Sequence, residues 1–246
     1  SIDEEAVTGY KKEVTGYNLK NSYTPGKTKV QVTKAWEDKD NQDGKRPASV
    51  TVKLLADGVE VPGKTLTLTA TNNWTGSFTD LDEYKAGNKI VYTVKEEEVG
   101  NGYDSKVIGS PEDGFKVINT RQTEKVNVEG TKTWNDADNQ DGKRPEKITV
   151  ELYKKVGDKQ PEKVTTQEVK ADKDGNWKYK FENLPKYEGG KEIKYSVKEV
   201  AVKDYTTEIN NFNITNKHTP EKTFVEGTKT WDDANNQDGK RPEKIT

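Results

Sequence analysis

Three polar residue types recur where a β-strand would point them into an apolar core. Side chains alternate between the two faces of a strand, so Lys34 shares a face with Val30, Val32 and Trp36. A later strand carries a glutamate on its apolar face, and the last strand of the same stretch carries an asparagine. These candidates are Lys34, Glu96 and Asn119 in one copy and Lys132, Glu199 and Asn216 in the next.

A lysine, a glutamate and an asparagine on separate strands are the groups that a self-made isopeptide bond requires. Burial lowers the pKa of a lysine amine and so frees the lone pair that attacks the asparagine amide. The same apolar surroundings favour a protonated carboxyl, which can hydrogen-bond the amide carbonyl and move protons as ammonia leaves. The fold holds the groups together at a high effective concentration. Each domain would react once, so the chemistry is maturation and not enzymatic turnover.

An unreacted cluster of the same three residues is the alternative, because buried ion pairs are far commoner than isopeptide bonds. The recurrence of all three residues in register across copies favours the bond. In the first copy Glu96, Glu97 and Glu98 are consecutive, and Glu98 has the same strand phase as Glu96. The choice of Glu96 therefore depends on its alignment with Glu199.

The strands that would position these residues belong to a sequence repeat of about 97 to 98 residues, which is the length of a domain. Each copy contains the block N-Q-D-G-K-R-P. The repeat predicts four segments: 1–25 as the end of a preceding repeat, 26–121 and 122–219 as complete repeats, and 220–246 as the start of a following repeat. We therefore expect a piece of a longer protein. Its incomplete copies keep Glu4 and Asn21 without a lysine, and Lys229 without an acid or an amide.

Alternation of apolar and polar residues predicts seven short strands in each complete repeat and no helix. The expected strands are 29–36, 49–55, 64–70, 74–79, 89–97, 103–108 and 115–120, and then 125–134, 147–156, 163–170, 177–182, 192–200, 205–209 and 212–217. Strands and turns at this spacing predict an all-β chain of tandem antiparallel β-sandwiches.

Composition excludes several classes of function. The chain has no cysteine, which excludes disulfides, thiolate metal sites and cysteine nucleophiles. Its 41 Lys and Arg residues balance 43 Asp and Glu residues for a net charge of −2, so no basic stripe for nucleic acid is expected. A single histidine, His218, excludes a histidine triad and a multi-histidine metal site. No apolar run is long enough to insert in a membrane, and we expect no cofactor and no metal.

The acidic block D-x-D-N-Q-D-G resembles a calcium loop at first sight. With Gly44 at the sixth position of such a loop, the first is Lys39 and the twelfth is Val50, where an EF-hand needs Asp and Glu. A solvated turn is the favoured interpretation, and looser oxygen coordination stays open. The five tryptophans share strand faces with apolar residues, which favours core packing over a carbohydrate platform.

The block K-T-W…D-x-D-N-Q-D-G-K-R-P, the strand Y-[ST]-V-K-E and the final strand I-[TN]-N or V-I-N resemble the Cna B-type repeats of collagen-binding adhesins of Gram-positive bacteria. The resemblance covers essentially the whole chain. It implies a prealbumin-like or inverse-immunoglobulin sandwich and intramolecular Lys–Asn bonds assisted by an acidic residue. If the family's motif positions are carried over, one bond would join Lys34 to Asn119, with Glu96 as the acidic residue. The other would join Lys132 to Asn216, with Glu199 as the acidic residue.

The resemblance also implies a cellular location and a role for the protein. We expect an extracellular stalk, anchored to the cell wall through another region, whose repeats contact one another end to end. A separate part of the full protein would bind the host extracellular matrix. The alternative is that the repeats themselves bind a host matrix protein or a carbohydrate through their exposed strands and acidic loops.

Overall fold

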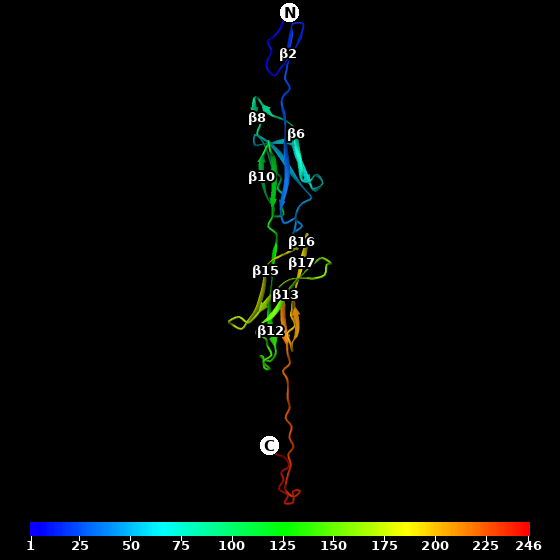
Figure 1. Cartoon of the computed structure of the whole chain (residues 1–246), viewed down its shortest axis with the longest axis vertical. Coiled ribbons are helices and arrows are strands. Elements are labelled where there is room, and N and C mark those ends of the chain that lie inside the picture. The colour runs from blue at the N-terminus through cyan, green and yellow to red at the C-terminus, as the bar shows by residue number, and fades with distance from the viewer. The chain divides into compact units, whose positions relative to one another are not determined.

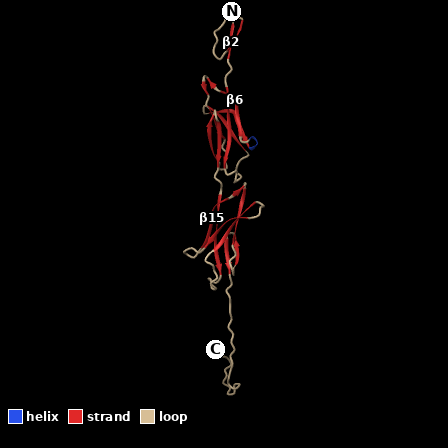
Figure 2. Cartoon of the chain, in the orientation of Figure 1, coloured by secondary structure: helices blue, strands red, loops and turns tan.

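The computed structural model describes all residues from Ser1 to Thr246 and consists almost wholly of strands and loops (Figures 1 and 2). Its one helical element is a single 3-10 turn, η1, at Ala70–Asn72. None of its helical structure has the length and apolar character that a membrane span needs. The all-β fold class expected from the alternation is confirmed.

The chain forms two compact units. The first contains Ser1–Val128, Tyr153–Val164 and Lys180–Ser196, and the second contains Glu129–Leu152, Thr165–Tyr179 and Val197–Thr246. The residues of the first candidate site all lie in the first unit, and those of the second site all lie in the second. The repeat boundaries 26–121 and 122–219 stay a prediction.

The first unit contains a four-stranded and a three-stranded sheet. The order of the four-stranded sheet is β10-β11-β3-β6, and its strands are β10 (Asp104–Ser110), β11 (Gly114–Thr120), β3 (Lys27–Glu37) and β6 (Thr75–Asp82). The order of the three-stranded sheet is β5-β4-β9, and its strands are β5 (Val59–Thr69), β4 (Ser49–Ala56) and β9 (Tyr92–Glu96). The first unit also contains two small hairpins: β1 (Lys11–Thr15) with β2 (Asn18–Ser22), and β7 (Tyr84–Lys85) with β8 (Asn88–Lys89).

Every second residue of β3 is buried, which is the pattern that a half-covered strand requires. Val30 and Val32 are fully buried and lie in one core cluster with Val52, Leu54 and Val117. Each such side chain contributes about 1.5 to 3 kcal/mol on burial. The same alternation places Lys34 inward, so the apolar pattern that stabilises the sheet also buries the amine.

The strands from β12 onward form two four-stranded sheets. In one, of order β15-β12-β19-β18, the strands are β15 (Trp177–Pro185), β12 (Lys125–Asn135), β19 (Asn213–Lys217) and β18 (Thr206–Asn210). In the other, of order β14-β13-β17-β16, they are β14 (Glu162–Val169), β13 (Ile148–Val156), β17 (Lys191–Glu199) and β16 (Tyr187–Glu188).

One pairing in each repeat differs from the antiparallel expectation. Strand β11 pairs with β3 in parallel, and β19 pairs with β12 in parallel. Parallel neighbours need a long crossover, and here the intervening strands of the repeat supply it. The register places Lys34 opposite Val117 and Asn119 opposite Trp36. The first and last strands of a repeat are therefore direct neighbours.

The strand expected over 89–97 is interrupted. The structure has β8 and β9 there, with Ile90 and Val91 outside the ladder. The amide of Val91 donates to Oδ1 of Asp57 at 2.9 Å, and the amide of Ile90 donates to the carbonyl of Glu83 at 2.9 Å. Both amides are satisfied outside a regular sheet, which explains why alternation alone missed the break.

Candidate functional site

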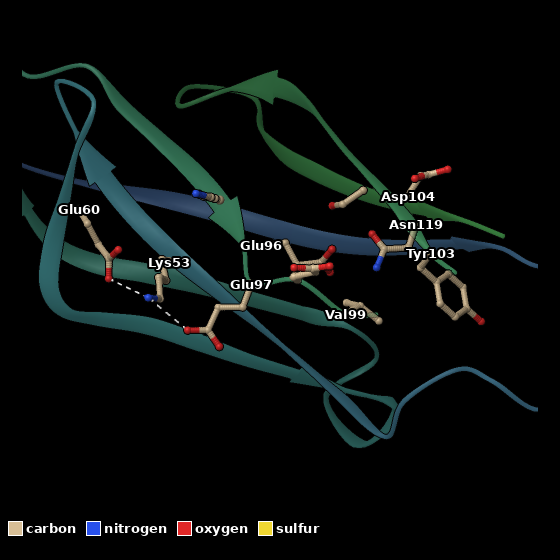
Figure 3. Close-up of a pocket in the computed structure, with 11 residues that line it drawn as sticks. Lys53, Glu60, Glu96, Glu97, Val99, Tyr103, Asp104 and Asn119 are labelled. Carbon is tan, nitrogen blue, oxygen red and sulfur yellow. Dashed lines mark ion pairs between the residues drawn. The ribbon is translucent and has the colours of Figure 1, made fainter. Parts of the chain in front are cut away.

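The first cluster of candidate residues is buried between the two sheets of the first unit. Lys34 lies on β3, Glu96 on β9 and Asn119 on β11. The side chains of Lys34 and Glu96 are 0% and 1% exposed, their Nζ and Oε1 atoms are 3.7 Å apart, and Asn119 is fully buried. Figure 3 shows Glu96 and Asn119 facing each other across the same cavity. The structure thus brings together the three residues that the sequence selected.

The second cluster repeats this arrangement in the second unit. Lys132 on β12 and Glu199 on β17 have fully buried side chains, with 3.5 Å between Nζ and Oε1. Asn216 on β19 is also fully buried. Lys132 pairs in register with Ile214, so Asn216 is two residues further along the neighbouring parallel strand and on the same face. Adjacent strands are about 4.8 Å apart, so Lys132 and Asn216 project into the same core from neighbouring strands.

The glutamate chosen by alignment is the buried one. Glu96 is buried, whereas Glu97 and Glu98 are exposed. Glu97 instead forms an ion pair with Lys53, which also contacts Glu60 (Figure 3). Burial therefore separates three consecutive carboxylates that strand phase alone left ambiguous.

Burial lowers the pKa of Lys34 and of Lys132 to about 8, and the neighbouring glutamate opposes that shift only in part. An amine with a pKa of about 8 is neutral in about a tenth of molecules at pH 7, against fewer than one in a thousand for an exposed lysine. A neutral amine has the free lone pair that nucleophilic attack requires.

A group of aromatic rings covers each lysine. Nζ of Lys34 lies 4.0 Å from the ring centre of Trp36, whose indole packs edge-on against Trp74 at 5.2 Å and Tyr103 at 5.1 Å. The other lysine is covered in the same way by Trp134, Trp177 and Tyr205. Trp177 is buried, and Trp36, Trp74 and Trp134 are half-buried, so they pack against the core as the sequence indicated. The expectation was wrong for Trp231, which is 39% exposed.

Several buried polar atoms of the two clusters have no hydrogen-bond partner. They are both side-chain polar atoms of Asn119 and of Asn216, both carboxyl oxygens of Glu96, and Oε1 of Glu199. An unsatisfied buried polar atom costs about 1 to 3 kcal/mol, and native proteins keep few of them outside reactive sites. The side chains of the two asparagines are therefore buried without a direct hydrogen bond to another protein group.

The sequence pattern of the Cna protein B-type domain matches residues 30–120, 128–217 and 225–246. The chain belongs to this family. It is 46% identical over 245 residues to the collagen adhesin of Staphylococcus aureus, an alignment that covers 100% of this chain and 20% of the adhesin. The crystal structure of two B repeat units, B1B2, of the collagen binding protein (Cna) of Staphylococcus aureus is similar with a TM-score of 0.70 and 47% identity. That match covers 96% of this chain and 61% of the other.

The resemblance inferred from the motifs is thus confirmed, and the chain is homologous to the B repeats of an adhesin. It spans about a fifth of the length of the curated relative that it matches. The incomplete copies differ from the complete Cna B-type repeats. In the first incomplete copy, the side-chain amide of Asn21 donates to Glu4 at 2.8 Å, but the copy has no matching lysine. In the last copy, Lys229 is exposed, and its Nζ lies 4.0 Å from the ring centre of Trp231.

The acidic loop of these Cna B-type repeats is not the solvated turn that the sequence suggested. Asp38 is 3% exposed and accepts two hydrogen bonds from Arg46, at 2.7 and 3.0 Å. It also accepts the hydroxyl of Tyr103 at 2.6 Å and the amide of Asn41 at 2.9 Å. Burial alone would raise the pKa of Asp38, but the bonds from Arg46 and Tyr103 hold it at about 2. The solvated-turn interpretation was wrong for this carboxylate, which anchors the loop to the sandwich.

The same network recurs around Asp136, with Arg144, Tyr205 and the amide of Asn139 as donors. A signal for it was present in the sequence. An arginine follows the aspartate by eight positions in all three copies, at Asp38 and Arg46, Asp136 and Arg144, and Asp233 and Arg241.

A second carboxylate of each loop holds the segment that follows the repeat. Asp43 pairs with Arg121 and accepts the amide of Glu124 at 2.8 Å. In the second unit Asp141 accepts the amide of Glu221 at 2.9 Å and lies 2.9 Å from Nε2 of His218. The guanidinium at the first position keeps its charge at all physiological pH values, whereas the imidazole at the second titrates.

We expect the segment after the second repeat to be held more firmly in acid than in base. Asp141 raises the pKa of His218 above 6.5, with help from the carbonyl of Asp204. A raised folded-state pKa gives stability that is complete below the unfolded pKa and is lost as pH rises through the folded one. Histidine NMR titration should show the raised pKa, and Asp141→Asn should bring it down. A His218 pKa that Asp141→Asn leaves unchanged would contradict the assignment.

Proposed function

We propose that this chain is a stalk segment of a bacterial surface adhesin, and that a Lys–Asn isopeptide bond clamps each complete repeat. The observation that carries the proposal is the twice-repeated cluster of a buried lysine, glutamate and asparagine. Homology to the B repeats of an adhesin supports the stalk role. In this proposal the repeats follow one another end to end outside the cell, a region beyond this chain anchors the protein to the cell wall, and another contacts the host matrix.

The reaction at the second cluster is a transamidation. The neutral Nζ of Lys132 attacks Cγ of Asn216, a new carbon–nitrogen bond forms, and the bond from Cγ to Nδ2 breaks. Glu199 takes a proton from Nζ and delivers it to the leaving nitrogen, so ammonia departs and the carboxyl returns to its starting state. Lys34, Asn119 and Glu96 perform the same reaction in the first repeat.

The lowered lysine pKa and the unpartnered amide atoms both favour this chemistry over an unreacted cluster. At a pKa of about 8 the amine reaches its reactive form without a strong base. In the product one amide replaces a buried amine and a primary amide, and its N–H and C=O can both bond the glutamate. The bond therefore relieves polar groups that the unreacted cluster leaves unsatisfied.

The position of the bond gives it a mechanical role. It would connect β3 to β11, or β12 to β19, which are the first and last strands of a repeat and are adjacent and parallel. A pulling force enters a repeat through its first strand and leaves through its last. With a covalent link between these strands, the load bypasses the intervening strands and the sandwich stays closed.

The intact mass of the purified chain tests the proposal. We expect a deficit of two ammonia molecules relative to the sequence mass, with linked peptides that contain Lys34 with Asn119 and Lys132 with Asn216. Asn119→Ala should restore one ammonia and leave the second linked peptide unchanged. An unmodified mass in the folded wild type would refute the cross-links and leave only the homology to adhesin repeats.

A further inference from the structure

Glu199 has one contact that its counterpart Glu96 lacks. The hydroxyl of Thr207 donates to Oε2 of Glu199 at 2.7 Å. Thr207 lies on β18, directly opposite Asn216 in the register of the sheet. Its side chain therefore connects the strand beside the amide to the carboxyl that lies against the amine.

The contact divides the roles of the two carboxyl oxygens. Oε2 accepts from Thr207, whereas Oε1 has no hydrogen-bond partner and is the oxygen 3.5 Å from Nζ of Lys132. Since the side chain of Glu199 is fully buried, a hydrogen bond to Oε2 strongly restricts the orientation of the carboxyl. A carboxyl fixed at one oxygen presents the other in a single direction.

We propose that Thr207 is a positioning residue for the cross-linking reaction of the second repeat. The inference rests on the proposed function. Thr207 keeps Oε2 occupied as an acceptor, so Oε1 takes the proton from Nζ of Lys132 and gives it to the departing nitrogen of Asn216. Thr207 itself neither gains nor loses a proton.

The first repeat provides an internal comparison. Ser105 is the matching residue, because it lies opposite Asn119 in the register of β10 and β11. It lines the same cavity as Glu96, yet both oxygens of Glu96 have no hydrogen-bond partner. The side chain of threonine is branched at Cβ and more restricted in χ1 than that of serine, so its hydroxyl is better held toward one acceptor. We therefore expect the second bond to form faster than the first.

The rates can be compared within one molecule. The chain is made by cell-free synthesis, chased for increasing times and quenched in denaturant, and both linked peptides are quantified by mass spectrometry. Thr207→Val should slow formation of the Lys132–Asn216 link by about tenfold, since valine keeps the shape and removes the donor. Thr207→Ser keeps a hydroxyl that is less restricted in χ1, so its rate should lie between those of Thr207→Val and the wild type. The Lys34–Asn119 link should form at the wild-type rate in both variants.

Thr206→Val is the matched control, because Thr206 is the neighbouring residue on the same exposed edge strand and does not reach Glu199. Equal rates of the second link in wild type and Thr207→Val would overturn the role of Thr207 and leave the proposed function intact. Absence of both links from the wild type would overturn both proposals. If Thr207→Val prevents folding of the second repeat, the Thr207→Ser rate decides: a second link that forms more slowly than in the wild type supports the positioning role, and one that forms at the wild-type rate contradicts it.

Discussion

Glu199→Gln is expected to leave the second repeat without its cross-link and to lower its melting temperature sharply. A glutamine side chain fills the same space but cannot take a proton from Nζ of Lys132 and pass it on. The link from Lys132 to Asn216 closes a loop of about 85 residues, which is worth about 4 to 5 kcal/mol if it behaves like a disulfide of that span. For a domain of this size, the loss corresponds to a fall in Tm on the order of 20 °C.

Two measurements on the same sample check this result. The mass deficit relative to each protein's own sequence mass should fall from two ammonia molecules to one, and calorimetry should show one transition displaced to lower temperature. Glu192→Gln is the control, because Glu192 lies on the same strand β17 with an exposed side chain. A Glu199→Gln protein with the wild-type mass and Tm would mean that Glu199 takes no part in a covalent link.

Much of this site could be predicted from strand phase and repetition. Alternation shows which face of a strand a residue occupies, so an inward lysine, glutamate and asparagine could be recognised without coordinates. Phase does not show which strands are neighbours. The parallel pairing that puts Asn119 on the strand next to that of Lys34 is a property of the whole sandwich, because it depends on how the intervening strands return the chain.

The residues that sequence reasoning missed are polar groups whose partners come from distant elements. Asp38 looked solvated because its loop is rich in charge, but Arg46 and Tyr103 close over it from later in the chain. Thr207 lies on a strand whose residues are all exposed, and nothing in its local sequence indicates that its hydroxyl turns toward a buried carboxyl. The spacing of Asp38 and Arg46 recurs in all three copies and could have indicated their contact, whereas the contacts of Tyr103 and Thr207 depend on tertiary positions that composition and periodicity do not encode.

Asp136→Asn should destabilise the second repeat by about 3 kcal/mol. Asp136 is 1% exposed and accepts two bonds from Arg144, at 2.6 and 3.0 Å, and one from Tyr205 at 2.8 Å. Neutralising one partner of a buried pair leaves the other charge uncompensated, which costs about 3 to 5 kcal/mol. We expect the lower end of this energy range because the Arg144 side chain is 25% exposed. The expected fall in Tm is on the order of 15 °C.

The pH dependence has a definite sign. The hydrogen bonds from Arg144, and secondly from Tyr205, hold the pKa of Asp136 at about 2. A depressed folded-state pKa contributes stability that is present above the unfolded value near 3.8 and is lost as pH falls through about 2. The difference in stability between wild type and Asp136→Asn should therefore shrink by about 2 kcal/mol across that interval.

The Asp136→Asn substitution should also affect the reactivity of Lys132. Tyr205, which Asp136 holds, packs against Trp134 at 5.0 Å, and Trp134 covers Nζ of Lys132 at 3.9 Å. Loosening this stack admits water to the amine and removes the burial that lowers its pKa, so the Lys132–Asn216 link should form more slowly in Asp136→Asn. Asp138→Asn is the matched control, since Asp138 belongs to the same loop and is exposed. Equal losses of stability in the two variants would show that the loop needs its charge and not the buried contact with Arg144.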